Sequence, residues 1–138
     1  MSSINIRLKP REKLYINGAV IKVDRRVSIE VLNDVSFLLE AHILQASDAT
    51  TPLRQLYFVI QSALMDPINS EAIKEMLREM TARTIISCDN REIQFALVEA
   101  GELTERGRYF DALRLIRGLY PLEAALLGKP EISNCEAA

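Results

Sequence analysis

Eight residues near the N-terminus carry groups that could bind a polyanion. Residues 1–26 hold seven bases against two acids, Glu12 and Asp24. Lysine and arginine neutralise backbone phosphates, and a tyrosine among them can stack on an unpaired base. The alternative is a solvated strand face whose charges only discourage edge-to-edge pairing. We predict an RNA-binding site made of Arg7, Lys9, Arg11, Lys13, Tyr15, Lys22, Arg25 and Arg26.

The rest of the chain offers little for catalysis or metal binding. His42 is the only histidine, and the sequence supplies no nucleophile or carboxylate to act with it. Cys88 precedes Asp89, whose charge opposes a reactive thiolate. One histidine and two distant cysteines cannot form a usual zinc set, and the glycine-rich phosphate and hydrolase motifs are absent from the sequence. We predict no enzymatic activity, no metal site and no cofactor.

The basic residues lie on predicted short strands. Asn17-Gly18 separates two apolar-rich runs and is typical of a two-residue hairpin turn. That turn pairs Lys13 with Lys22 across the two strands. Like charges facing each other destabilise a strand pair, which favours an anionic partner, although both side chains could instead splay into water at little cost.

Further strands are predicted by alternation of apolar and polar residues over 4–9, 27–31 and 35–44. Together with the hairpin they make about five short strands, in a meander or a small barrel-like sheet. We expect Phe37 and Leu39 on one face of the last strand and His42 on the other. The outward face of the sheet would collect Arg7, Lys9, Lys13, Lys22 and Arg26.

Residues from 47 onward follow helical spacing instead. Thr51 and Pro52 are typical of an N-cap and a first helical position, and Met65-Asp66-Pro67 ends that helix. A second helix is predicted over about 70–86, and the capping-box spacing of Asp89 and Glu92 predicts the start of a third. A fourth is predicted over 109–127, with a break before Pro121 and an end at Gly128. We predict an α+β fold: a small N-terminal antiparallel sheet (1–46), a C-terminal helical bundle (51–128) and a frayed tail (129–138).

Arg54 and Gln55 fall in the first turn of the first helix, directly after the junction. The apolar stripe of that helix leaves them without a packing role. A cation in a first turn is mildly unfavourable with the helix dipole, so we expect a compensating contact for Arg54. It either locks the two parts of the chain together, or extends the basic surface or contacts a protein partner.

Composition places the chain among globular proteins. It has 138 residues, 49% of them hydrophobic, and a net charge of −2. We see no candidate membrane span and no signal peptide, and the distant cysteines fit a reduced cytoplasmic setting. Because a five-stranded sheet of this size buries little surface, we also expect a homodimer.

Three stretches resemble the FlbT family of flagellar regulators: residues 15–20, 24–27 and, most specifically, 49–58 (Ala-Thr-Thr-Pro-Leu-Arg-Gln-Leu-Tyr-Phe). The resemblance implies a cytoplasmic post-transcriptional regulator that binds the 5′ untranslated leader of flagellin mRNA and alters its translation and decay, by repression or activation. It also implies a small partner protein, FlaF, and no catalytic residues.

Two further interpretations stand beside that one. Leu8 and the spacing Glu12-x-Leu14-x-Ile16 are weakly similar to the start of the CsrA-type RNA regulators. Alternatively, the acidic helical part binds FlaF or flagellin and acts on the mRNA only indirectly, as a protein-interaction module or chaperone-like factor.

Overall fold

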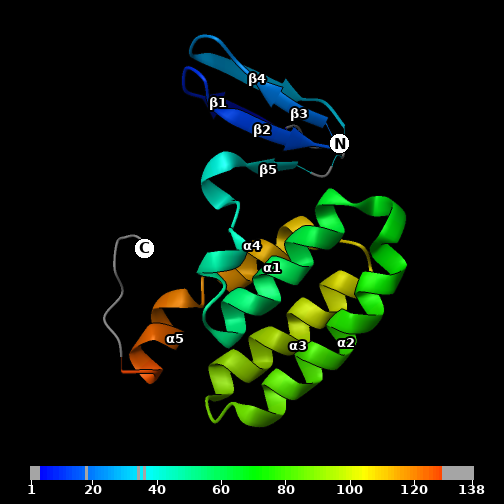
Figure 1. Cartoon of the computed structure of the whole chain (residues 1–138), viewed down its shortest axis with the longest axis vertical. Helices are drawn as coiled ribbons and strands as arrows, with labels where there is room; N and C mark the ends of the chain where they lie inside the picture. Colours follow the sequence, from blue (N-terminus) through cyan, green and yellow to red (C-terminus); the bar gives the residue numbers. More distant parts are fainter. Residues whose placement is uncertain (1–3, 18, 34, 36, 129–138) are drawn as a thin grey trace.

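The computed structural model describes residues 4–17, 19–33, 35 and 37–128. Within these residues, five strands lie before residue 40 and five α-helices follow, which confirms the α+β prediction (Figure 1). The predicted tail, residues 129–138, lies outside the described part of the chain. The strands are β1 Ile4–Leu8, β2 Lys13–Ile16, β3 Ala19–Lys22, β4 Val27–Val31 and β5 Phe37–Leu39.

The strands form two small antiparallel sheets and not a meander, one of the two arrangements expected. β1 pairs with β4, and β2 lies between β3 and β5. The hairpin register is the predicted one, with Lys13 opposite Lys22 and Ile16 opposite Ala19. Gly18 of the predicted turn lies outside the described residues. A shared apolar core joins the two sheets; it consists of Ile6, Leu8, Leu14, Val31 and Phe37.

The last strand is much shorter than the predicted 35–44. β5 ends at Leu39, and Glu40–His42 form the 3-10 turn η1, so His42 is not on a strand. Phe37 and Leu38 are both buried, at 5% and 0% exposure, because β5 contacts two cores at once. Phe37 belongs to the core of the sheets, whereas Leu38 belongs to the core of the helices.

The helices begin and end close to the predicted positions. Thr51 caps the first one by accepting the Arg54 N–H, and Asn90, not Asp89, caps the third by accepting the Ile93 N–H. Gly107 and Gly128 follow helix ends with positive φ, where glycine avoids the Cβ clash. The helices are α1 Pro52–Met65, α2 Ser70–Ser87, α3 Arg91–Glu105, α4 Tyr109–Arg117 and α5 Tyr120–Leu126, with 3-10 turns η2 Ala46–Asp48 and η3 Pro67–Asn69.

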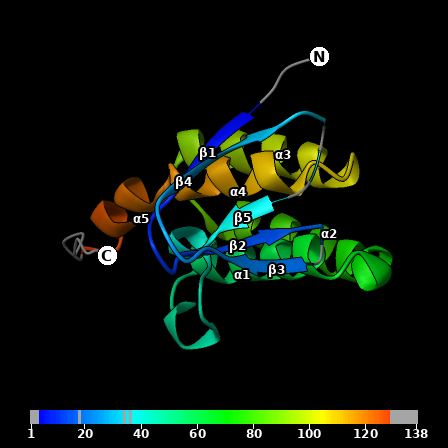
Figure 2. The same cartoon turned by 90° about the horizontal axis from the view of Figure 1, so that it is seen from above.

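The sheets sit over one end of the helices, and β5 is the strand nearest to them (Figures 1 and 2). The Phe37 ring stacks at 4.6 Å on the Phe110 ring of α4. The connection between the two parts is held by the buried Gln61 of α1, whose side-chain amide both accepts the Leu44 N–H and donates to the Leu44 carbonyl. Buried polar groups need such partners, so Gln61 fixes the path of the linker.

Candidate nucleic-acid interface

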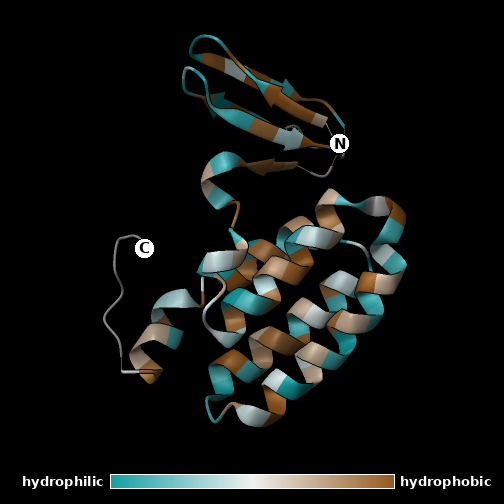
Figure 3. Ribbon diagram, viewed as in Figure 1, coloured by the Kyte–Doolittle hydropathy of each residue, from teal (hydrophilic) through white to brown (hydrophobic). Residues whose placement is uncertain are grey.

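Two turns that are distant in sequence meet at one end of the sheets. Residues 9–12 connect β1 to β2, and residues 23–26 connect β3 to β4. The Arg11 N–H donates to the Val23 carbonyl at 2.7 Å, and the Val23 N–H donates to the Glu12 carbonyl at 3.4 Å. In Figure 1 both turns lie at the upper left, and Figure 3 colours them largely hydrophilic.

The first of these turns holds an arginine in an unusual conformation. The Glu12 N–H donates to the Lys9 carbonyl, and Pro10 and Arg11 are the two central residues. Arg11 has φ of 68°, in the left-handed region that a type II turn requires at this position. Glycine is the usual residue there, since a side chain costs about 1–2 kcal/mol. An arginine in its place points to a use for the guanidinium.

We call the bases carried by these two turns the basic turn end; they are Lys9, Arg11, Arg25 and Arg26. All four side chains are exposed. Of the two acids on these turns, Glu12 accepts the Lys9 N–H and so helps to hold the turn. A third acid, Glu40, accepts the N–H of the adjacent Lys13. Asp24 pairs with Arg25 at 3.5 Å, and both side chains are so exposed that the pair contributes little. The basic turn end therefore presents excess positive charge to solvent.

The other predicted site residues are not all on one face, which corrects the expectation of a single basic sheet face. Arg7 lies on β1, on the side facing away from the buried Ile6 and Leu8. Lys13 and Lys22 lie on the second sheet, on the face that also carries Tyr15 and Leu38. They are exposed and one residue away from the turns, so they extend the basic turn end along β2 and β3.

Tyr15 shares a face with Lys13 and Lys22, but its ring is not fully exposed to solvent. Its side chain is half-buried and packs against the core of the helices, opposite Val20 on β3 and Leu38 on β5. Because the ring packs between the sheet and the helices, it is not available to stack on a base. The periodicity of β2 placed Tyr15 beside Lys13, but only the tertiary packing shows which face the helices cover.

Arg54 lies in the first turn of α1, directly after the linker. Its guanidinium is centred 4.0 Å from the Tyr120 ring, so a cation–π contact holds α1 to α5. This contact joins Arg54 to another helix and not to the basic turn end. Gln55 is exposed and lines a shallow depression with Met80 and Arg83 of α2.

A polar cluster that the sequence did not suggest surrounds Arg54. The Tyr57 hydroxyl donates to the His42 carbonyl and accepts from Arg117 at 3.0 Å. Burial, and secondarily the Arg117 charge, lower the pKa of His42, so the imidazole is neutral at pH 7. The buried Glu123 of α5 accepts the Leu53 N–H at 2.9 Å and thereby satisfies a free donor of the first turn of α1. These contacts join the linker, α1, α4 and α5.

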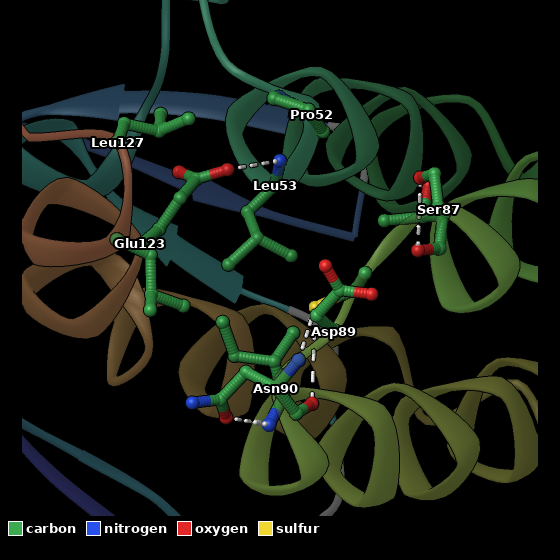
Figure 4. A pocket seen from close by; sticks show the side chains of 11 residues that line it. Pro52, Leu53, Ser87, Asp89, Asn90, Glu123 and Leu127 are labelled. Carbon is green, nitrogen blue, oxygen red and sulfur yellow. Dashed lines mark hydrogen bonds between the residues drawn. The ribbon is translucent and has the colours of Figure 1, made fainter.

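A cavity of about 450 Å³ lies where α5 meets the α2–α3 turn (Figure 4). Its walls are Pro52, Leu53 and Glu123 on one side and Ser87, Asp89 and Asn90 on another, with Leu127 at the edge. Cys88 also lines it, but its sulfur accepts the Asn90 N–H at 3.5 Å, and no histidine lines the cavity to activate it. Within the described residues, no group of three or more potential ligands could hold a metal ion.

Tyr120 gives the first prediction. Its buried hydroxyl has no hydrogen-bond partner among the described residues, and burial raises its pKa well above the usual 10, with the nearby Tyr57 adding to the shift. Because the pKa of Tyr120 is higher in the folded than in the unfolded chain, the free energy of unfolding is independent of this group below about pH 10. Above that pH it falls, since the unfolded chain releases the proton more readily. We expect Tyr120→Phe to raise the free energy of unfolding at pH 7 by about 1 kcal/mol and to flatten its decline above pH 10.

Urea unfolding of both proteins at pH 7 and at about pH 10.5 measures this directly. Phenylalanine keeps the ring under Arg54 and removes only the hydroxyl. A loss of stability at pH 7 would show that the hydroxyl is satisfied and would contradict the prediction.

Comparison with known proteins agrees with the sequence motifs. The profile of the family described as "Flagellar protein FlbT" matches residues 4–127. The chain belongs to the FlbT family. A relative from Mesorhizobium japonicum, "Probable flagellum biosynthesis repressor protein FlbT", is 48% identical over 127 residues, which cover 92% of this chain and 86% of the relative.

Two other relatives show the same extent of similarity. "Probable flagellum biosynthesis repressor protein FlbT 2" of Bradyrhizobium diazoefficiens is 48% identical, over 90% of this chain and 91% of its own. The FlbT protein of Agrobacterium fabrum, with the same description as the Mesorhizobium relative, is 45% identical, over 96% and 89%. All three relatives are described as probable repressors of flagellum biosynthesis. No solved structure matches the chain. Within the part of the chain described, no helix is long and apolar enough to cross a membrane.

Proposed function

We propose that this FlbT-family chain represses flagellum biosynthesis by binding the 5′ untranslated leader of flagellin mRNA through the basic turn end. The observation that carries the proposal is the meeting of Lys9 and Arg11 with Arg25 and Arg26 at one exposed end of the sheets. Lys13 and Lys22 continue this charge along the hairpin, and Arg7 lies on the neighbouring sheet. The bound mRNA would then be translated less or degraded faster, and the protein itself catalyses no reaction.

Salt dependence tests whether binding is direct. Four phosphate contacts to single-stranded RNA give a slope of about −2.8 in a plot of log affinity against log salt, or roughly a 50-fold loss between 50 and 200 mM. Filter binding of a labelled flagellin leader to the purified chain over this range measures the slope. A slope near zero, or no binding, would favour the second candidate below.

The second candidate is a protein-interaction role, in which the helical part binds FlaF or flagellin and the mRNA responds indirectly. The exposed apolar residues on α3, described below, favour it. An apolar helix contact need not weaken as salt rises. Pull-down of purified FlaF and flagellin at two salt concentrations separates the two candidates.

We also propose that the chain is a homodimer through β3. This strand is at the edge of its sheet, and all four of its residues are exposed. The Val23 N–H donates to Glu12, on the β2 side. Backbone groups of successive residues point to opposite edges of a strand, so the N–H and C=O of Val20 and Lys22 point to the free edge. Antiparallel pairing centred on Ile21 would place Val20 against the partner's Lys22, so that no like charges face each other.

Light scattering of the purified chain at micromolar concentration should therefore give a dimer mass near twice 15.6 kDa. Val20→Pro removes one of the edge donors and should yield a monomer of unchanged helical content. A wild-type monomer would contradict this proposal without affecting RNA binding by the basic turn end.

A further inference from the structure

Helix α3 exposes apolar side chains at the centre of its solvent-facing side. Its buried stripe is formed by Ile93, Leu97 and Ala100, at 3%, 0% and 1% exposure. Helical periodicity puts Phe95 and Val98 on the opposite side, and they are 71% and 50% exposed. Neighbouring apolar residues left in water on a helix face mark an interaction site when polar groups surround them.

Carboxylates surround these two side chains. Glu92 lies one turn before Phe95, Glu99 one turn after it, and Glu102 one turn after Val98, all on the exposed side. None of the three forms an ion pair with another described residue, whereas Glu105 nearby is held by Arg78. Two bases lie at the ends of this side: Arg91 at the first position of the helix, and Arg106, which caps its C-terminus one turn after Glu102. We call Phe95, Val98, Glu92, Glu99 and Glu102 the α3 face.

We propose that the α3 face docks a basic amphipathic helix of a partner protein. Such a helix would place two apolar side chains, three or four residues apart, against Phe95 and Val98. Lysines or arginines one turn to either side would then reach the carboxylates. The distance from Glu92 to Glu102 along the helix is about 15 Å, so roughly three turns of a partner helix suffice.

Charge decides between possible occupants. RNA would oppose the three carboxylates with phosphates, which is repulsive. A second copy presenting its own α3 face would oppose them with three further carboxylates, and only Arg91 and Arg106 at the ends of the helix could offset that repulsion. A cationic helix instead gains contacts with acids that have no other partner. This face could have been predicted from the sequence, because Phe95 and Val98 fall outside the apolar stripe of α3 that packs on α2 and α4.

The α3 face is separate from the basic turn end. In Figure 1, α3 lies at the lower part of the helices, whereas the turns lie at the top, beyond β5. A partner on α3 and a polyanion on the turns would therefore not compete for the same surface. This inference does not depend on RNA binding.

The test uses the full-length chain and a labelled probe peptide of about 18 residues, with leucines at i, i+3, i+4 and i+7 and lysines one turn to either side. We expect saturable binding by fluorescence anisotropy. The double variant Phe95→Ser/Val98→Ser should lower the affinity at least tenfold, as loss of a central aromatic anchor does. Glu92→Gln/Glu99→Gln/Glu102→Gln should weaken binding and reduce its dependence on salt.

Matched controls separate the α3 face from general stickiness. Ile68→Ser removes an apolar side chain of 93% exposure from η3 and should leave peptide affinity unchanged. A glutamate-for-lysine peptide and a scrambled peptide of the same composition should bind at least tenfold more weakly. Equal binding of the scrambled peptide, an equal loss of affinity in Ile68→Ser, or no saturable binding overturns the proposal. So does a change in the oligomeric mass of the chain in the double variant, because the face would then be a self-interface.

Discussion

Replacing Arg11, Arg25 and Arg26 together by glutamate should lower affinity for a flagellin leader by at least about 100-fold, because three phosphate contacts become three repulsions. The bases of the basic turn end lie on two turns joined by backbone bonds between Arg11, Glu12 and Val23. These bonds do not involve the replaced side chains, so the fold should persist. The remaining binding should also lose most of its salt dependence, by about 0.7 in slope for each contact removed.

A matched triple variant controls for net charge. Arg83, Arg106 and Arg114 are exposed residues of the helical part, outside the basic turn end, and their replacement by glutamate changes the charge by the same amount. We expect this control to keep wild-type affinity within about threefold, since exposed charges beyond a Debye length are screened. Equal losses in the two variants would remove the basic turn end from the mechanism. Circular dichroism and thermal melts of both variants establish that they are folded.

The largest expected loss of stability follows Leu38→Ala. Leu38 is fully buried in the core of the helices although it belongs to a strand, so its side chain anchors the β3–β2–β5 sheet to α1 and α4. Removing a buried leucine side chain costs about 3 kcal/mol, including the cavity left behind. For a domain of this size the melting temperature should fall by about 10 °C.

Leu32→Ala is the matched control for Leu38→Ala. The Leu32 side chain is 66% exposed near the same sheets, and its loss should change stability by less than about 0.5 kcal/mol. Urea unfolding at pH 7 measures both variants. A cost near 1 kcal/mol for Leu38→Ala would mean that β5 is not docked on the helices as the structure shows. Hydrogen exchange adds a second readout, because in Leu38→Ala the amides of β2 and β5 should lose more protection than those of α2.

Local chemistry was enough to predict most elements of the fold. Asn17-Gly18 set the β2–β3 register because few dipeptides adopt positive φ in a two-residue turn. Thr51 and Pro52 predicted the start of α1, because Thr51 accepts a backbone N–H that has no partner inside the helix. Gly128 predicted the end of α5, because glycine adopts positive φ readily. The bases of the candidate site were also visible, because their number near the N-terminus is a property of composition.

Only the tertiary structure decided which residues act together. Alternation predicted a strand over 35–44, but contact with two cores buries both faces of β5, and neither Ala41 nor Ile43 continues it. Tyr15 shares the periodicity of the bases, yet the helices cover it. The two basic turns are adjacent because the local β2–β3 hairpin is combined with the pairing of β1 and β4, a long-range contact that no local propensity encodes. The sequence alone thus determined most of the secondary structure, the charge and the family, while packing determined the end of β5 and the surfaces.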